Sequence, residues 1–219
     1  MRDKRTWMSV WTCGLALLTV ECSPEPSEEL AVLPYHELEL SGPGRTPRVR
    51  LPAGAPKAWQ AEGYRPWRHI VIHHSATDAG SAAVFDKWHR ARGWDELGYH
   101  FVIDNGHGGP DGRIEVSRRW TIQKWGAHCG GTPANEYNNY GIGICLVGTF
   151  SRRRPSERQL ASLDRLVTCL AGAYGIAPER VIGHRDAPKA STDCPGDRLE
   201  KYIVGTLRAK VADAARGGS

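Results

Sequence analysis

The sequence lacks the features that define several protein classes. Its longest apolar stretch, at residues 7–20, is too short and broken for a polytopic membrane protein. No repeat of solenoid or propeller period occurs along the chain. The six cysteines include no CxxC pair and no regular spacing, which argues against a disulfide framework. The net charge is only +5 for 219 residues. This mild excess suits an anionic partner but does not distinguish between nucleic acid, membrane and cell wall.

The start of the chain has the pattern of an export signal. Basic residues precede the apolar stretch, and the proline- and glutamate-rich segment after it argues against a buried first helix. Cys22 stands where a bacterial lipoprotein carries its lipidated cysteine, but Glu21 replaces the small residue usual before it. The sequence predicts a signal peptide at residues 1–22 and an exported protein of the periplasm, cell envelope or extracellular space. It leaves a lipid anchor at Cys22 open.

Two further regions follow the signal. Residues 23–64 are rich in proline, glycine and glutamate and have no sustained helical period, which predicts a tether with short extended pieces such as residues 36–40. From Trp67 the composition changes to that of a globular domain. We therefore expect one folded domain at residues 65–216.

Within this domain, apolar runs alternate with helical patterns. The continuous apolar run at residues 141–148 is typical of a central buried strand. Ser156 and Gln159 form an S-x-x-Q capping box at the start of a long amphipathic helix. The pattern predicts an α/β fold with a central mixed β-sheet flanked by helices. Its expected strands are 69–74, 99–104, 113–116, 141–148 and 181–183, and its expected helices are 81–92, 156–175 and a last one from 197.

Three separated segments carry side chains that ligate metals. His73 and His74 end a predicted strand, His184 follows another, and Cys194 lies ten residues later in a polar, proline-bearing loop. A His/His/Cys set leaves one tetrahedral position open, which is how catalytic zinc sites are built. Taken singly, each residue is also consistent with a surface histidine or a buried cysteine, and only the fold can bring them together.

Four motifs occur in an order that resembles a known family. They are IHHSAT, WHRARGWDELGYHF, GAH followed by GIGICLVGTF, and GHRDAPKASTDCPG, and together they span roughly residues 67–199. They resemble the amidase-2 family, which includes T7-type lysozyme-amidases and peptidoglycan recognition proteins. The resemblance implies a single zinc amidase domain that cuts the amide between the lactyl group of N-acetylmuramic acid and L-alanine of the stem peptide.

The resemblance also implies a site. One Zn2+ per chain would be held by His73, His184 and Cys194, with His73 in the family's I/V-H-x-S/T position. Alternation along the strand would then turn His74 to the other face, as a core residue or a neighbour of the site. Tyr99 in GYHF matches the family's catalytic tyrosine.

Thr192 occupies the position where phage enzymes carry lysine and catalytic recognition proteins carry threonine. The tetrahedral oxyanion of amide hydrolysis needs a hydrogen-bond donor, and the hydroxyls of Tyr99 and Thr192 suit that role. Cys145 stands where the cytosolic recycling branch has a glutamate, so the sequence resembles the tyrosine-using branch. His128 aligns with a groove histidine and is expected to contact substrate. Asn138 is expected either to bind the muramyl or peptide part or to be an ordinary loop residue.

Three function classes compete. The leading one is a peptidoglycan hydrolase acting on peptidoglycan or muropeptides. The second is a non-catalytic peptidoglycan-binding module of the same fold, but such modules lack the zinc-binding cysteine, and Cys194 is present here. The third, a nucleic-acid binder, rests only on a pI near 9.0 and has no motif to support it.

Two smaller predictions complete the interpretation. Trp88 and Trp94 are expected to pack the first helix against the sheet, since aromatic residues at helical spacing are usually buried. A monomer is the default, because neither heptads nor a large apolar surface stretch occurs. The sequence leaves open the preferred stem peptide, intact wall or soluble fragments as target, the biological role, and whether Cys129 forms a disulfide.

Overall fold

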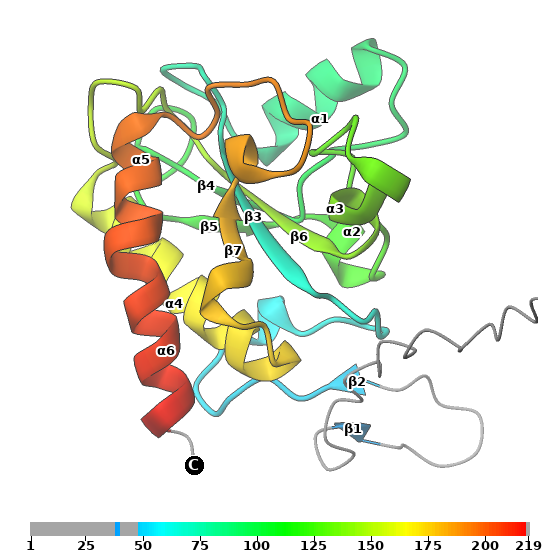
Figure 1. The fold of residues 1–219 in the computed structure, drawn as a ribbon. Coiled ribbons are helices and arrows are strands. Elements are labelled where there is room, and N and C mark those ends of the chain that lie inside the picture. The colour runs from blue at the N-terminus through cyan, green and yellow to red at the C-terminus, as the bar shows by residue number, and fades with distance from the viewer. Residues whose placement is uncertain (1–37, 40–47, 218–219) are drawn as a thin grey trace, which may run out of the picture. The chain divides into compact units, whose positions relative to one another are not determined.

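A five-stranded mixed sheet organises the part of the chain that the computed structural model describes, residues 38–39 and 48–217 (Figure 1). The strand order is β5-β4-β6-β3-β7, and all neighbours are parallel except β4 and β5. The predicted mixed sheet, with the 141–148 run at its centre, is therefore confirmed. The predicted export signal at residues 1–22 lies outside the described residues. The strands are β3 (His69–His74), β4 (Phe101–Ile103), β5 (Ile114–Val116), β6 (Gly141–Leu146) and β7 (Val181–Gly183).

The predicted helices are present, with shorter ones between them. Ser156 and Gln159 form the predicted capping box, each side chain bonded to the other's backbone N–H. The C-terminal helix begins at Asp197 and runs through one π-helical turn without a break (Figure 1). The helices are α1 (Ala82–Ala91), α2 (Arg118–Thr121), α3 (Glu136–Asn139), α4 (Glu157–Tyr174), α5 (Asp197–Tyr202) and α6 (Arg208–Gly217); single turns are η1 (Lys57–Trp59), η2 (Pro133–Asn135), η3 (Pro178–Arg180), η4 (His184–Asp186) and η5 (Ile203–Leu207).

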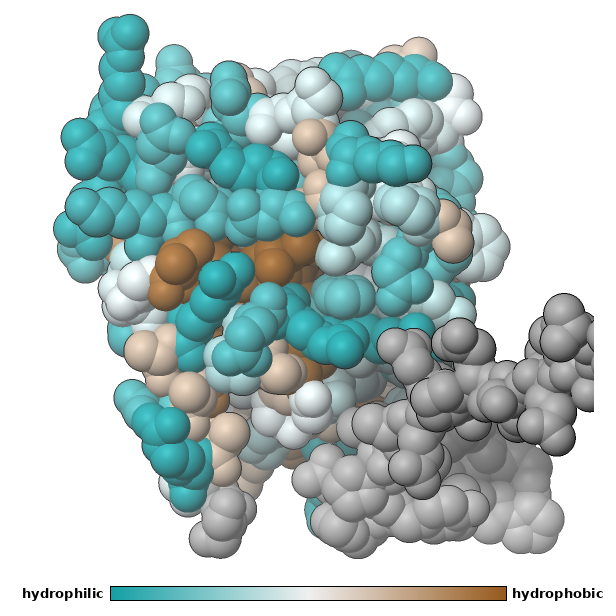
Figure 2. Space-filling view, viewed as in Figure 1, coloured by the Kyte–Doolittle hydropathy of each residue, from teal (hydrophilic) through white to brown (hydrophobic). Residues whose placement is uncertain are grey.

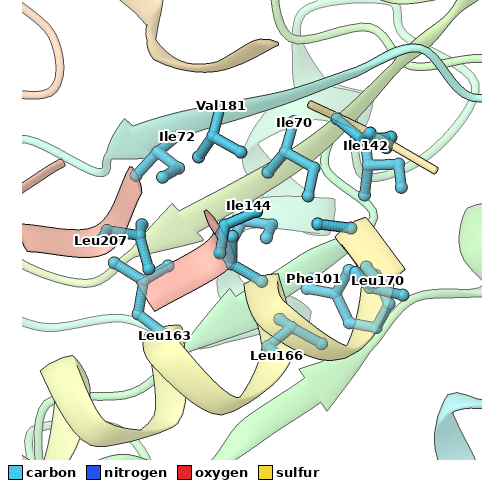
Figure 3. Close-up of a cluster of buried hydrophobic side chains, with 14 of the residues drawn as sticks. Ile70, Ile72, Phe101, Ile142, Ile144, Leu163, Leu166, Leu170, Val181 and Leu207 are labelled. Carbon is cyan, nitrogen blue, oxygen red and sulfur yellow. The ribbon is translucent and has the colours of Figure 1, made fainter. Parts of the chain in front are cut away.

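One face of the sheet forms the main core. Even-numbered residues of β3 and β6, such as Ile72 and Ile144, point toward α4 and the C-terminal helix (Figure 3). Each fully buried aliphatic side chain of this kind stabilises the fold by about 1.5–3 kcal/mol. From the helices, the side chains that meet them are Leu163, Leu166, Leu170 and Leu207 (Figure 3).

The opposite face of the sheet carries the chemistry. Alternation turns His73 away from the α4 core, and the parallel register sets it beside Cys145 of β6. β7 lies on the other side of β3, and His184 follows its last residue. Because the carboxyl ends of parallel strands meet at one edge, this topology brings His73 and His184 together.

Part of the predicted tether belongs to the folded domain. β2 (Arg48–Val49) pairs with β1 (Leu38–Glu39), and Val49 and Trp59 are buried in the main core. The indole Nε1–H of Trp120 donates to the carbonyl of Trp59 at 2.7 Å. Residues 49–61 thus differ from the expected free tether. Their apolar residues are too widely spaced among prolines to show a period.

The expected burial of Trp88 and Trp94 is wrong. Their exposed fractions are 42% and 40%, and the buried side of α1 is formed by Phe85 and His89 instead. Each tryptophan retains one aromatic contact, with Phe85 and His89 respectively. Only Phe85 and His89 of α1 are buried, so the domain covers a narrow stripe of the helix and Trp88 falls beside that stripe.

On the side that Figure 2 shows, the surface is largely hydrophilic and has one hydrophobic patch. Among residues 48–217, no helix combines the length and apolar composition that a membrane crossing requires. Within the same residues, the large hydrophobic side chains that are exposed are Val84, Trp88, Trp94, Ile122, Trp125 and Val204.

Candidate metal centre

The three predicted ligands converge at the carboxyl ends of the strands. Ligand atoms of His73, His184 and Cys194 all lie within 4.8 Å of one another. Sγ of Cys194 is 3.7 Å from Nδ1 of His73, although the residues are 121 positions apart. The ring centroids of His73 and His184 are 4.6 Å apart. His73 and Cys194 are buried and His184 is half-buried, so this group could hold a metal ion.

The donor set fits zinc. Bonds of about 2.3 Å to sulfur and about 2.1 Å to nitrogen separate tetrahedral ligand atoms by about 3.5 Å, close to the observed spacing of sulfur and Nδ1. Burial lowers the pKa of His184, and burial followed by the neighbouring His128 lowers the pKa of His73 well below its usual value. Both rings are therefore neutral, the form that ligates. Burial raises the pKa of the Cys194 thiol to about 12, and a bound cation would favour its thiolate.

His74 stays outside this group, as strand alternation predicts. Its Nδ1 accepts from the backbone N–H of Phe150 at 3.4 Å. Its own backbone N–H points at Sγ of Cys194, 3.4 Å away. His74 thus orients the cysteine through its main chain, and of the two adjacent histidines it is His73 that offers a ring nitrogen to the ligand group.

Tyr99 and Thr192 flank the ligand group. The Tyr99 ring is partly buried and its centroid lies 5.2 Å from that of His73. Burial, and then the thiols of Cys145 and Cys194, raise the Tyr99 pKa well above its usual value, so its hydroxyl is protonated at neutral pH. The Thr192 hydroxyl accepts from the backbone N–H of Cys194 at 3.1 Å, and its own hydrogen is free to donate.

Cys145 has a contact that the sequence did not indicate. Cys145 is buried, and its thiol lies near enough to the Tyr99 hydroxyl to raise the pKa of that hydroxyl. The pairing of Cys145 with His73 across β6 and β3 places it beneath the site. The signal in the sequence was its position in the family pattern, where the recycling branch carries a glutamate. All four cysteines of the described residues are free, Cys129 included.

His128 and Asn138 are both buried beside the ligand group. Nδ1 of His128 lies 3.0 Å from Nε2 of His73, and its Nε2 lies 3.2 Å from the carbonyl oxygen of Gly141. The amide oxygen of Asn138 accepts from the backbone N–H groups of His128 and Cys129 at 2.8 and 2.9 Å. Asn138 therefore holds the loop that carries His128. Contact of either residue with substrate stays a prediction.

Comparison with known proteins relates the chain to cell-wall amidases. Residues 63–197 match the family model described as N-acetylmuramoyl-L-alanine amidase (Amidase_2). The chain is 30% identical over 195 residues to the N-acetylmuramoyl-L-alanine amidase of Sus scrofa, a match covering 78% of this chain and 30% of that protein. It is 32% identical over 144 residues to the endolysin of Enterobacteria phage K11, covering 61% of this chain and 83% of the endolysin.

The fold agrees with these sequence matches. The ectodomain complex of peptidoglycan recognition proteins LCa and LCx, solved with tracheal cytotoxin bound, matches with a TM-score of 0.53 and 31% identity. The match covers 64% of this chain and 82% of that one. The chain spans less than a third of the pig amidase's length, so its likeness to that protein concerns one domain.

Proposed function

Since the chain belongs to the N-acetylmuramoyl-L-alanine amidase (Amidase_2) family, we propose that it is a zinc-dependent peptidoglycan hydrolase. The bond cut is the amide between the lactyl group of N-acetylmuramic acid and L-alanine of the stem peptide. The observation that carries this proposal is the convergence of His73, His184 and Cys194 at one edge of the sheet. Peptidoglycan or muropeptides are the partners, and one Zn2+ per chain is the cofactor.

Each ligand has a defined task. His73 and His184 present neutral ring nitrogens, and Cys194 presents its sulfur, with the Tyr99 ring centroid 5.2 Å from that of His73. Zinc, when bound there, acts as a Lewis acid and lowers the pKa of water to about 7. A set of three protein ligands is the pattern of catalytic zinc sites, whereas structural sites use four.

Tyr99 and Thr192 supply the proton chemistry. The Tyr99 hydroxyl, kept protonated by burial, donates to the oxyanion that develops on the attacked carbonyl. The Thr192 hydroxyl, fixed by the backbone N–H of Cys194, is a second donor on the neighbouring loop. The departing L-alanine amine requires a proton, and we propose that the Tyr99 hydroxyl relays to it the proton that the attacking water loses.

A non-catalytic recognition module of the same fold is the second candidate. The structure of the LCa–LCx pair has tracheal cytotoxin bound, a monomeric diaminopimelic acid-type peptidoglycan. The complete His/His/Cys set and Tyr99 favour the hydrolase.

We further propose export of the protein by its predicted signal at residues 1–22, testable by cell fractionation of the tagged full-length chain.

A digest of purified peptidoglycan tests the proposal. The chain from residue 23 onward is incubated with intact wall and with soluble muropeptides, and products are identified by mass spectrometry. The proposal predicts stem peptides with free L-alanine amino termini and glycan with free lactyl carboxylates. Cys194→Ser should abolish both, whereas Cys169→Ser should not, since Cys169 is half-buried in α4. Binding of fragments without cleavage by the wild-type chain would instead identify a recognition module.

A further inference from the structure

The ring of His128 lies in a slot made by two glycines. A Cβ atom on Gly126 would come within 2.4 Å of ring carbon Cδ2, and one on Gly143 within 2.3 Å of the same atom. Distances this short are not tolerated, so glycine at both positions makes room for the ring. The His128 side chain is buried, and its backbone N–H is bound by Asn138. The position of the ring is therefore fixed by the fold.

The partners of this ring determine where its proton lies. The carbonyl oxygen of Gly141, 3.2 Å from Nε2, can only accept, so Nε2 carries a hydrogen. The ring is buried, and its two nitrogens face only the Gly141 carbonyl and the His73 ring, so no counter-charge supports a cationic ring and it is neutral with a single N–H. Nδ1 of His128 is consequently an acceptor.

The acceptor Nδ1 of His128 in turn determines where the proton of His73 lies. Its Nε2 lies 3.0 Å from the bare Nδ1 of His128, so this nitrogen of His73 must donate. A neutral His73 with hydrogen on Nε2 has a bare Nδ1. That Nδ1 is the atom facing Sγ of Cys194 at 3.7 Å.

We propose that His128 is a positioning residue that holds His73 in the tautomer whose Nδ1 ligates the metal. The backbone carbonyl of Gly141 orients His128, and His128 in turn orients His73. Outer partners of this kind fix the ring orientation of ligating histidines. This role differs from the substrate contact expected from the sequence. The inference rests on the proposed zinc site but is independent of peptidoglycan as substrate.

Imidazole 15N NMR of the metal-free chain tests the tautomers without any substitution. Long-range 15N–1H correlations distinguish rings protonated at Nε2 from rings protonated at Nδ1. The inference predicts Nε2–H for both His73 and His128 at neutral pH. A His73 ring protonated at Nδ1 would overturn it.

Zinc affinity, measured by competition with a chelator, tests the role directly. Asparagine places a carbonyl oxygen near the position of Nδ1, whereas leucine of the same shape places a methyl group there. His128→Leu should weaken zinc binding about 10–100-fold. His128→Asn should recover most of the affinity, because His73 regains an acceptor.

A third variant removes no polar group. Gly143→Ala would push the His128 ring out of its slot and should weaken zinc binding in the same direction. Circular dichroism of the metal-free variants shows whether each is folded. Unchanged zinc affinity in folded His128→Leu would refute the positioning role and restore substrate contact. A wild-type chain that binds no zinc would defeat the proposed function, while the tautomer measurement would still decide this inference.

Discussion

Removing the Tyr99 hydroxyl is the substitution that separates chemistry from metal binding. Tyr99→Phe keeps the ring that packs beside His73 and His89, with centroids 5.2 and 5.5 Å away. It deletes the proposed donor to the oxyanion. Tyr99 is not among the three ligands, so the zinc content of the variant should equal that of the wild type.

The expected size of the effect follows from what one donor contributes. Loss of a single oxyanion donor typically lowers kcat by about 100–1,000-fold, or about 2.7–4 kcal/mol of transition-state stabilisation. KM should change little, because the donor acts on charge that develops during the reaction. The polar neighbour of the Tyr99 hydroxyl is the Cys145 thiol, a weak hydrogen-bonding group, so loss of the hydroxyl should leave folding stability nearly unchanged.

The assay follows release of free L-alanine amino termini from a soluble muropeptide at several substrate concentrations. Tyr140→Phe is the matched control, since Tyr140 precedes β6 at the opposite end from the ligand group, with its ring over Arg68. It should retain full activity. Wild-type kcat in Tyr99→Phe, at equal zinc content, would refute the assignment of Tyr99 to the chemical step.

Three further predictions concern the scaffold. Leu166→Ala, in the core between α4 and the sheet, should cost about 2–5 kcal/mol of unfolding free energy in denaturant titrations. Ser156→Ala, which removes half of the capping box, should cost about 1 kcal/mol in the same measurement. Burial, followed by the charge of Asp186, raises the pKa of Glu200 to about 7, above the value of about 4.3 in an unfolded chain. The folded protein thus holds a proton that the unfolded chain releases, so its stability falls as pH rises from about 4 to about 7. Glu200→Gln should reduce this fall, measured as Tm against pH. An unchanged profile of Tm against pH would contradict the prediction.

The sheet and its helices could be predicted because their signals are local. The apolar run of β6, the β-branched run of β3 and the capping box at Ser156 each lie within a few consecutive residues. The ligand set was predictable in a different way. No single spacing joins His73 to Cys194, and only the order of four motifs pointed to the group that the fold assembles.

The remaining features depend on contacts between distant segments. The hydrogen bond between His73 and His128 joins residues 55 positions apart. The sequence around either histidine does not show that the other is its partner. Trp59 is buried, and its carbonyl accepts from Trp120, which lies 61 positions further along the chain. Exposure of Trp88 follows from how little of α1 the sheet covers, which helical spacing alone does not reveal.

The central claim is that His73, His184 and Cys194 form one zinc site on which amide cleavage depends. Its most direct test is titration of the metal-depleted chain with Zn2+ while muropeptide cleavage is followed. We expect no cleavage without metal, a linear rise in cleavage up to one zinc per chain, and a plateau beyond it. Cys194→Ser should show neither the rise nor stoichiometric binding. Full cleavage by the metal-depleted chain, or full zinc-dependent cleavage by Cys194→Ser, would contradict the account.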